Sequence, residues 1–309
     1  MTESSGDFDV AIIGGGPGGL SAALWCADLG VNTIICEKEP EFGGQLLWTF
    51  NAIKNYLGSD AANGFEMRDG FLQHIENTNV TRLTRAAVVK TDLANKSIEL
   101  ADGTRCSAKA VIIATGVRRR KLDVPGEDEY RGRGVLESGV RSKNEVRGKT
   151  VMIVGGGDAA FENALILSAT AEKVIIVHRR NEFTARKDFI QQAKKSSNVE
   201  ILTDSRLTAI NGNTVVASVD LVNAVTGWRS ELVADAVLIR IGVVPNTELF
   251  RGQIALDEAG YISIGPRCET SLERIYAVGD VTNLLSPTIS TATGMGATAA
   301  KAIYNKLQN

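Results

Sequence analysis

The 309-residue chain lacks the features of several protein classes. It has no run of 18 consecutive apolar residues, so we expect no membrane-spanning helix. Lys and Arg number 34 and Asp and Glu 36, and the resulting charge of −2 gives no overall attraction to nucleic acid or an anionic membrane. Aromatic residues make up only 6%, and histidine occurs twice. No Ser–His–Asp set or metal-binding cluster is apparent in the sequence.

Cysteine is scarce and widely spaced, at Cys26, Cys36, Cys106 and Cys268. No two of these lie within three residues of each other, which excludes a Cys-x-x-Cys pair and zinc-knuckle spacing. Scattered thiols of this kind are typical of buried side chains in a reducing compartment. Residues 1–9 are polar and acidic, without the basic stretch of a secretory signal. We therefore expect a cytoplasmic protein.

Glycine, in contrast, is abundant, with 31 residues. Five of them lie in residues 14–19 (GGGPGG), directly after a strand-like run at Asp9–Ile13 and before a helix expected from about Leu20. The spacing is Gly14-x-Gly16-x-x-Gly19. The first glycine permits a tight turn, the second lets a pyrophosphate approach the backbone, and the third lets helix and strand pack closely. This turn predicts a dinucleotide site, with the helix N-terminus facing the phosphates.

The second strand of this unit, Asn32–Cys36, ends at an acidic residue, Glu37. A carboxylate at that position can accept hydrogen bonds from both ribose hydroxyls of an adenosine. The strand before the glycine turn, the helix after it and this acid together make the prediction much stronger than a glycine motif alone.

A second copy of the pattern follows in the middle of the chain. A strand expected at Thr150–Val154 leads into Gly155-x-Gly157-x-x-Ala160, and a helix is expected from about Phe161. The 141 residues between the two turns are too long a period for a solenoid and fit two nucleotide-binding units.

The next strand of the second unit, Lys173–Val177, ends in His178-Arg179-Arg180 instead of an acid. Guanidinium groups bind a ribose 2′-phosphate through charge-assisted hydrogen bonds, whereas an acid would repel it. This favours NADP(H) over NAD(H). A solvated basic surface and a vestigial site are the alternatives.

Three further glycine turns follow predicted strands. They are Thr115-Gly116, Gly242 and Gly279-Asp280. The carboxyl ends of parallel strands gather at one edge of a sheet, where cofactors bind. We therefore expect these turns near a cofactor. The Asp280 carboxylate would accept a hydrogen bond from a hydroxyl group of the ribityl chain or one linked to the pyrophosphate. Ordinary turns are the alternative interpretation.

The order of these motifs resembles the low-molecular-weight thioredoxin reductase family of flavoproteins. The matching segments run nearly from end to end: GGGPGG at 14–19, GGQL at 43–46, NYLG at 55–58, ATG at 114–116, GGGDAA at 155–160, HRR at 178–180, IGxxPN at 241–246 and VGD at 278–280. The resemblance implies an α/β fold with two Rossmann-like dinucleotide-binding domains. It places FAD in residues 1–117 and 246–309, and NADPH in the inserted residues 118–245. It also implies a homodimer formed largely by the FAD domains.

The resemblance also implies the residues that bind each cofactor. The expected FAD residues are Gly14, Gly16, Gly19, Glu37, Gln45, Asn55, Thr115, Gly116 and Asp280, with Val88 as a backbone contact to the adenine. The expected NADPH residues are Gly155, Gly157, Asp158, Ala159, His178, Arg179, Arg180 and Arg186, with Glu162 near the nicotinamide. The family has an arginine where this chain has Thr184, so Arg186 would belong to a looser clamp.

One departure from the family decides the expected chemistry. The family carries Cys-x-x-Cys-Asp between two segments that are present here at 132–135 and 147–149. The cysteine positions read Ser138 and Arg141, and the acid position reads Ser142. Neither serine nor arginine can form a disulfide, so electron transfer from flavin to a disulfide is not expected at this place. We predict an FAD-dependent NAD(P)H oxidoreductase that reduces an external acceptor and uses no catalytic side chain.

The acceptor is open at this point, as are two other functions. Arg118–Lys121, a basic run, is either a solvated hinge or a docking surface for an acidic redox protein such as a ferredoxin or flavodoxin. A ferredoxin-linked flavoprotein with a vestigial NADP(H) site is one alternative function. An FAD-holding sensor or scaffold without turnover is the other.

Overall fold

The computed structural model describes residues 4–282 and 285–308. The chain divides into two compact units: unit 1 comprises residues 1–118 and 244–309, and unit 2 comprises residues 119–243. The divisions lie within two residues of those that the family resemblance places at 117/118 and 245/246.

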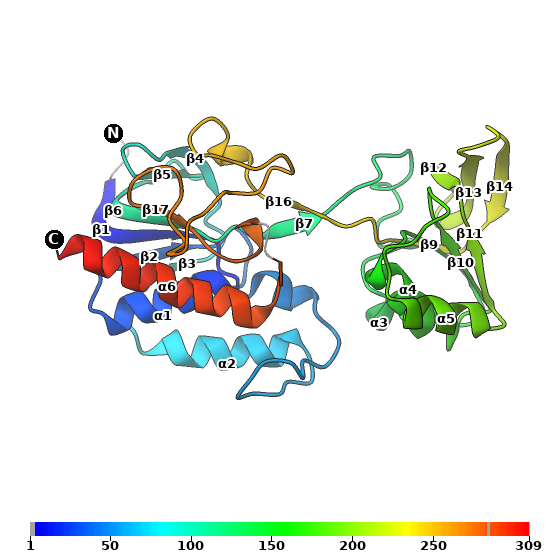
Figure 1. Cartoon of the computed structure of the whole chain (residues 1–309), viewed down its shortest axis with the longest axis horizontal. Helices are drawn as coiled ribbons and strands as arrows, with labels where there is room; N and C mark the ends of the chain where they lie inside the picture. The colour runs from blue at the N-terminus through cyan, green and yellow to red at the C-terminus, as the bar shows by residue number, and fades with distance from the viewer. Residues whose placement is uncertain (1–3, 283–284, 309) are drawn as a thin grey trace. The chain divides into compact units, whose positions relative to one another are not determined.

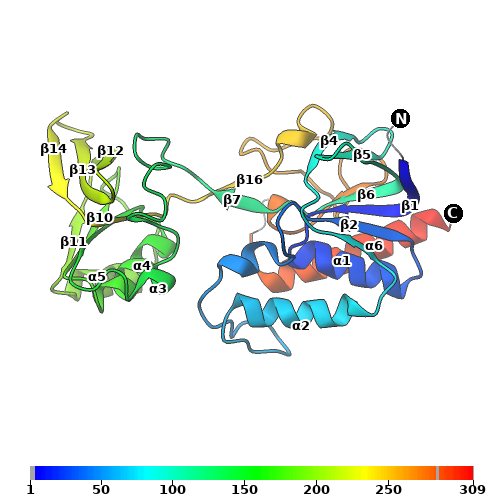
Figure 2. The ribbon, with the colours of Figure 1, turned by 180° about the vertical axis from the view of Figure 1, so that it is seen from behind.

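Unit 1 is built on a largely parallel sheet with helices on one face (Figures 1 and 2). Its strands are β1 (Ser4–Ile13), β2 (Thr33–Cys36), β3 (Thr81–Leu83), β4 (Val88–Asp92), β5 (Ser97–Leu100), β6 (Arg105–Ile113) and β17 (Ile275–Ala277). Its helices are α1 (Pro17–Asp28), α2 (Gly64–Glu76) and α6 (Ile289–Leu307), with short 3-10 turns η1 (Gly44–Trp48), η2 (Glu248–Phe250) and η3 (Gly279–Thr282). The strand order is β3-β2-β1-β6-β5-β4, with β17 beside β6.

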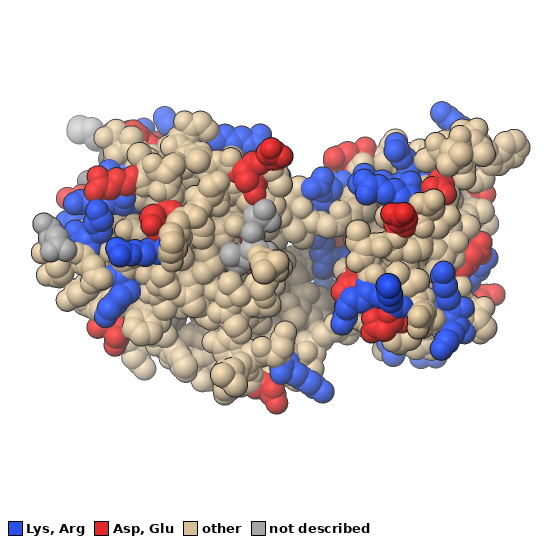
Figure 3. All heavy atoms as spheres, viewed as in Figure 1, with Lys and Arg blue, Asp and Glu red and all other residues tan. Residues whose placement is uncertain are grey.

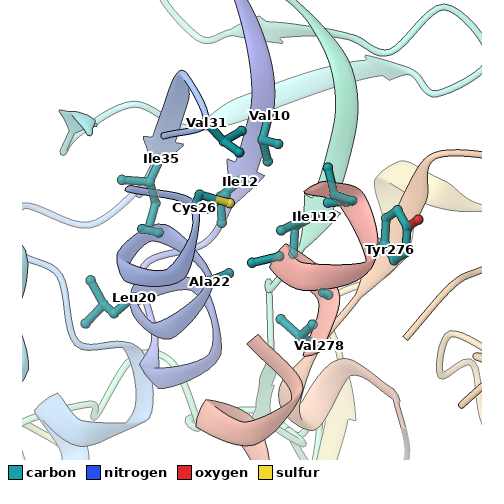
Figure 4. Close-up of a cluster of buried hydrophobic side chains, with 14 of the residues drawn as sticks. Val10, Ile12, Leu20, Ala22, Cys26, Val31, Ile35, Ile112, Tyr276 and Val278 are labelled. Carbon is teal, nitrogen blue, oxygen red and sulfur yellow. The ribbon is translucent and has the colours of Figure 1, made fainter. Parts of the chain in front are cut away.

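Strand β1 is apolar on both sides because both faces of the sheet are covered. Val10 and Ile12 pack toward α1 and α6, together with Cys26 (Figure 4). Ala11 and Ile13 pack on the opposite face, in a second cluster that includes residues of β5 and η2. This continuous apolar run, ending at a glycine, is the signal that identifies the strand in the sequence.

Unit 2 repeats the plan on a smaller scale. Its parallel sheet has the order β11-β10-β9-β15-β8, and an antiparallel sheet has the order β12-β13-β14. The parallel strands are β8 (Val135–Leu136), β9 (Thr150–Val154), β10 (Lys173–Val177), β11 (Val199–Leu202) and β15 (Ala236–Ile239). The antiparallel strands are β12 (Ser205–Gly212), β13 (Val216–Asn223) and β14 (Arg229–Val233), and the helices are α3 (Gly139–Ser142), α4 (Asp158–Ser168) and α5 (Lys187–Lys195). Two short strands, β7 (Val117–Arg119) and β16 (Val243–Pro245), pair with each other.

Strand β9, in the centre of the parallel sheet of unit 2, contributes side chains to the core on both faces of that sheet. Val151 and Ile153 pack with the residues of α4, whereas Met152 and Val154 pack with residues of the antiparallel sheet. The antiparallel sheet therefore covers the face that helices leave open.

The helices begin earlier than the sequence suggests. Helix α1 begins at Pro17 and not near Leu20, and α4 begins at Asp158 and not near Phe161. The last residues of each glycine turn form the first helical turn. The first N–H groups of a helix have no partner inside it, so low helix propensity is tolerated there.

Candidate cofactor sites

The glycine turn of unit 1 has a backbone that only glycine adopts easily. Gly14 has a φ of +107°, and a Cβ added to it would lie 2.4 Å from the Ala114 carbonyl oxygen. Its N–H donates to the Cys36 carbonyl at 2.8 Å, at the end of β2. Helix α1 follows with Gly16 as its N-cap, and no side chain caps it. The positive end of the helix is thus left for a ligand, as a pyrophosphate site requires.

Glu37 is a buried carboxylate beneath this turn, with 6% of its surface exposed. Its Oε2 accepts from the Gly15 N–H at 2.7 Å, and its Oε1 accepts from the Glu39 N–H at 2.9 Å. Each carboxylate oxygen has a further lone pair that can accept a hydrogen bond. The side chain is therefore fixed in place and can still accept hydrogen bonds from the two hydroxyls of a ribose.

The segment that contains Gln45 lies against the same turn. The Gly43 N–H donates to the Gly15 carbonyl at 2.8 Å, and a Cβ on Gly44 would lie 2.9 Å from the Gly16 Cα. The Gln45 Nε2 donates to the Val117 carbonyl at 2.8 Å. Gln45 therefore ties η1 to β7. No donor in the described part of the chain bonds its side-chain oxygen, which can accept from a ligand.

Thr115 and Gly116 follow β6 directly beside Gly14. The Thr115 hydroxyl donates to the Asn246 carbonyl at 2.8 Å, and the Asn246 side-chain amide donates back to the Thr115 carbonyl at 2.8 Å. The Asn246 N–H also donates to the Gly116 carbonyl at 3.0 Å. The threonine side chain therefore holds two distant segments of unit 1 together at the carboxyl edge of its sheet.

Asp280 is brought to the first turn of α1 by the packing of its neighbours. The Val278 N–H donates to the Ile113 carbonyl at 2.9 Å, and a Cβ on Gly18 would lie 3.2 Å from a methyl group of Val278. Among the described residues, the Asp280 carboxylate has no hydrogen-bond or ion-pair partner. Burial raises its pKa above the usual value. A half-buried carboxylate without a partner fits a ligand that presents hydroxyl donors.

The two remaining predicted FAD residues differ in their surroundings. Val88 begins β4, in a segment that runs beside the acid, since the Ala86 N–H donates to the Glu37 carbonyl at 2.8 Å. Asn55 lies exposed in a loop closed by hydrogen bonds between Ile53 and Ala61. No side chain or backbone group in the described part of the chain hydrogen-bonds the Asn55 amide.

The glycine turn of unit 2 has the same backbone arrangement. Gly155 has a φ of +153°, and its added Cβ would lie 2.1 Å from the Arg240 carbonyl oxygen. Its N–H donates to the Val177 carbonyl at 3.0 Å. Helix α4 has Gly157 as its N-cap and no capping side chain. This turn too leaves an open helix N-terminus.

Two of the predicted NADPH residues, Asp158 and Arg186, form an ion pair at the start of α4. The Asp158 carboxylate accepts from the Arg186 backbone N–H at 2.7 Å and from its Nε at 3.0 Å. The Arg186 guanidinium also lies 4.1 Å from the Phe189 ring centroid. Arg186 thus neutralises an acid in the first turn of α4, a role that the sequence did not reveal.

The other two predicted residues, Ala159 and Glu162, lie three residues apart on α4 and are neighbours on its surface. The Ala159 carbonyl accepts from the Asn163 side chain at 2.7 Å, whose oxygen in turn accepts from the Gly139 N–H at 3.0 Å. Glu162 is half-buried. Asn163, which joins α4 to α3, was not singled out by its sequence context.

His178 lies under the turn of unit 2, as Glu37 does in unit 1. A Cβ on Gly156 would lie 2.3 Å from the imidazole, whose Nε2 is 3.0 Å from the Glu182 carbonyl oxygen. Burial first, and then the charges of Arg179 and Arg180, lower its pKa despite the Glu182 carbonyl. The two arginines are exposed, and neither has an acidic partner in the described ranges. They remain available for a phosphate.

All four cysteines lie among the described residues, all are buried, and none forms a disulfide. Burial raises the pKa of Cys26 and of Cys268 to about 11 and that of Cys36 to about 12. Thiols held in the protonated form are poor nucleophiles and poor redox groups. Ser138, which the resemblance places at the first cysteine position of the family, caps α3 by accepting from the Arg141 N–H at 3.4 Å.

The basic run at 118–121 is largely paired. Arg118 contacts Glu248 at 2.6 Å, Arg119 donates to the Glu137 carbonyl at 2.6 Å, and Lys121 contacts Asp128 at 2.7 Å. Acidic and basic side chains are interspersed on the face shown in Figure 3. Within residues 4–282 and 285–308, no helix has the length and apolar character to cross a membrane, and no group of three or more metal-ligating side chains occurs.

Two glycine turns, one followed by a strand that ends in an acid and the other by a strand that ends in arginines, define a protein with two dinucleotide-binding units. Comparison with known proteins gives the family. Residues 8–299 match the family described as pyridine nucleotide-disulphide oxidoreductase, and the chain belongs to it.

The chain is similar to several thioredoxin reductases over almost its whole length. It is 34% identical to the thioredoxin reductase of Mycolicibacterium smegmatis over 97% of this chain and 96% of that protein. It is 32% identical to a 34.2 kDa protein in the rubredoxin operon of Clostridium pasteurianum, over 95% of each chain. The solved thioredoxin reductase of Lactococcus lactis matches with a TM-score of 0.85 and 33% identity, covering 96% of this chain and 98% of that one.

These findings confirm the predicted family, the two-domain Rossmann-like fold and the cofactors. Thioredoxin reductase-like proteins of this family are flavoprotein oxidoreductases that bind FAD and NADPH. The residues around each glycine turn, called the cradle of that unit below, fit a dinucleotide cofactor. Each turn has a helix end without a capping side chain, and unit 1 offers the Glu37 and Asp280 carboxylates.

Proposed function

We propose that this chain is an FAD-dependent NADPH oxidoreductase that passes electrons to an external acceptor without a disulfide of its own. The observation that carries the proposal is the state of the four cysteines. All are buried and outside any disulfide, and the three with a resolved shift have pKa values raised to about 11 or 12. A redox-active dithiol needs an accessible thiolate, and these side chains offer none.

Unit 1 supports FAD binding through backbone and carboxylate groups. The open N-terminus of α1 would hold the pyrophosphate, Glu37 the adenosine ribose, and Asp280 a hydroxyl on the flavin side of the pyrophosphate. FAD when bound supplies the redox chemistry, since its ring can take up a hydride and release electrons to an acceptor. The protein's part is to hold and orient that group, so no side chain is assigned a catalytic role.

Unit 2 supports NADPH binding through the turn at Gly155 and the two free guanidiniums at the end of β10. Arg179 and Arg180 would bind the 2′-phosphate, while neutral His178 supports the turn from below. Arg186 contributes by neutralising Asp158, which would otherwise place a negative charge beside the pyrophosphate. Glu162 is proposed to lie near the nicotinamide.

The first test is an anaerobic titration of the FAD-loaded protein with NADPH and then NADH, following the flavin absorbance. We expect NADPH to bleach the band at a lower concentration than NADH. If dithionite reduces the flavin and NADPH does not, the hydride input is refuted, and a ferredoxin-linked or non-catalytic role takes its place.

A reductive titration with dithionite tests the absence of a disulfide. A flavin alone takes a single two-electron equivalent, whereas a flavin with a redox disulfide takes two. We expect the protein to consume one equivalent per flavin before full bleaching. Consumption of two equivalents, reduced to one in a variant with Cys26, Cys36, Cys106 and Cys268 replaced by Ala, would refute the proposal.

A protein acceptor or donor is the second candidate for the external partner, and one comparison favours it. A relative of similar length is encoded in a rubredoxin operon, which associates it with a small electron-transfer protein.

We propose that this chain acts as a homodimer, as its thioredoxin reductase relatives do. Light scattering of the purified protein tests the dimer, and reduction of a ferredoxin, flavodoxin or rubredoxin by NADPH tests the partner.

A further inference from the structure

Arg240 stands at a position where the fold itself requires no arginine. The Arg240 N–H donates to Val154, the last residue of β9, and its carbonyl oxygen is the one nearest to Gly155. In unit 1 these two contacts, to Ile13 and Gly14, are made by Ala114. An alanine therefore meets the backbone requirements of the position, and the arginine side chain needs another explanation.

The side chains of Arg240 and Arg119 both donate hydrogen bonds to one backbone carbonyl group. Its guanidinium donates to the Ile239 carbonyl at 2.8 Å and to the Glu137 carbonyl at 2.9 Å. The Arg119 guanidinium donates to the same Glu137 carbonyl at 2.6 Å. Two cationic groups thus share one acceptor, and their charges lie side by side.

The Glu137 carboxylate attracts both guanidiniums, but it forms its ion pair with a third arginine. The Glu137 carboxylate contacts Arg131 at 2.7 Å, and Asp128 contacts both Arg131 and Lys121. No carboxylate in the described part of the chain lies within ion-pair distance of Arg119 or Arg240. Burial, and then repulsion by Arg119, lower the pKa of Arg240 to about 9, although attraction by the Glu137 carboxylate opposes the shift. Since a guanidinium stays charged in proteins, the pair is held at an electrostatic cost that a bound anion would offset.

The pair lies at one end of the proposed NADPH cradle. The parallel strands follow the order β10-β9-β15-β8, and Arg180, Gly155, Arg240 and Glu137 come after their carboxyl ends. Neighbouring strands are about 4.8 Å apart, so the pair lies beyond the glycine turn from the 2′-phosphate end. This assignment of ends rests on the proposed function. The nicotinamide half of the cofactor carries no phosphate beyond the pyrophosphate, so the cofactor itself does not provide an anion here.

We propose that Arg119 and Arg240 form a binding site in unit 2 for an anionic group, a phosphate or a carboxylate, on a small molecule other than NADP(H). Two guanidiniums on adjacent segments can bind such a group through paired, charge-assisted hydrogen bonds. At the nicotinamide end of the cradle, the site would hold an anionic co-substrate or effector next to the reacting part of the cofactor.

The test measures binding of inorganic phosphate and, separately, of malonate to the oxidised, FAD-loaded protein by isothermal titration calorimetry. No NADPH is added, so the result does not depend on flavin reduction. We expect Arg240→Ala to weaken binding of the preferred anion about tenfold or more, because charge-assisted hydrogen bonds are lost. Arg119→Ala is expected to do the same, and Arg240→Lys to give an intermediate affinity. Phosphate preference indicates a phosphate group on the natural ligand, and malonate preference a carboxylate.

Two controls separate this site from general charge effects and from the 2′-phosphate site. Arg229→Ala removes one exposed charge from β14 and should leave anion affinity unchanged. The double variant Arg179→Ala/Arg180→Ala should retain the anion site. The proposal is overturned if neither anion binds, if Arg240→Ala binds as tightly as the wild-type protein, or if binding is lost only in the double variant.

Discussion

The two glycine turns share their backbone hydrogen bonds but differ in the side chain that supports them. In unit 1 the residue after the second strand is Glu37, whose N–H donates to Leu83 at 2.8 Å. In unit 2 it is His178, whose N–H donates to Leu202 at 2.9 Å. Both side chains lie under the middle glycine of their turn. The backbone plan therefore defines a dinucleotide site in each unit, and the side chains at the strand end select the cofactor.

The acid is part of the fold of unit 1 in a way that the arginines of unit 2 are not. Glu37 is buried and accepts two backbone N–H groups, whereas Arg179 and Arg180 are exposed and make no ion pairs within the described ranges. Removing charge at the two strand ends should therefore have different consequences. The two units are expected to respond differently to changes in the turn backbone, in the strand-end charge and in the protonation of half-buried groups.

The largest effect is expected at the third position of the turn, which is Gly19 in unit 1 and Ala160 in unit 2. A Cβ on Gly19 would lie 2.0 Å from the Gly14 carbonyl oxygen. Gly19→Ala should destabilise unit 1 by about 3 kcal/mol and abolish FAD retention. Ala160→Gly, the matched variant, should cost only about 1 kcal/mol from the added backbone freedom. FAD content and thermal unfolding measure both. Equal losses would contradict the close approach of the Gly14 carbonyl to Gly19, because the added methyl group would then fit at little cost.

The next effect is expected at the strand-end charges. Glu37→Gln leaves one oxygen for the two backbone donors, so one of the Gly15 and Glu39 N–H groups loses its acceptor. We expect unfolding of the FAD-free protein to be easier by about 1–3 kcal/mol. The double variant Arg179→Ala/Arg180→Ala should unfold like the wild-type protein.

The same double variant should change cofactor choice. Loss of two charge-assisted contacts should raise the KM for NADPH in flavin reduction about tenfold to a hundredfold and leave that for NADH nearly unchanged. Stopped-flow reduction with each nucleotide provides the ratio. If both KM values rise together, the arginines do not contact the 2′-phosphate.

The turns and their strand ends could be predicted because each depends on residues close together in sequence. Long-range features could not. The meeting of Arg119 and Arg240 above Glu137 depends on the pairing of β15 with β8, which no local pattern specifies. The antiparallel sheet was also missed. Its strand β12 has register shifts, so buried Leu207 and Ile210 are three residues apart instead of alternating.

Arg186 is a second residue whose partner could not be predicted from the sequence. Its place near the arginine motif predicts a phosphate contact, which stays a prediction. In the structure its guanidinium also pairs with Asp158 and packs on Phe189. A basic residue near a phosphate site can bind the ligand or neutralise an acid, and only the structure shows the second partner.

The smallest effect is expected from protonation of Asp280 in unit 1 and His178 in unit 2, which change the stability of the folded state in opposite directions as pH falls. Burial raises the pKa of Asp280 above 3.8, so the folded state binds its proton more readily than the unfolded chain. This group therefore adds stability as pH falls through its folded pKa. The pKa of His178 is lowered from 6.5, so the unfolded chain binds the proton more readily. This group makes the protein less stable as pH falls below about 6.5.

Asp280→Asn and His178→Gln test this opposition in the FAD-free protein. At pH 7, Asp280→Asn should unfold at a slightly higher temperature, because it removes an unpaired buried charge, while its affinity for FAD falls. His178→Gln keeps a donor for the Glu182 carbonyl and should lose less stability than the wild-type protein between pH 7 and pH 5.5. The imidazole is partly exposed, so solvent screening should hold its effect well under about 1 kcal/mol. A wild-type protein no more sensitive to acid than His178→Gln would show that the imidazole is not held neutral by the turn of unit 2.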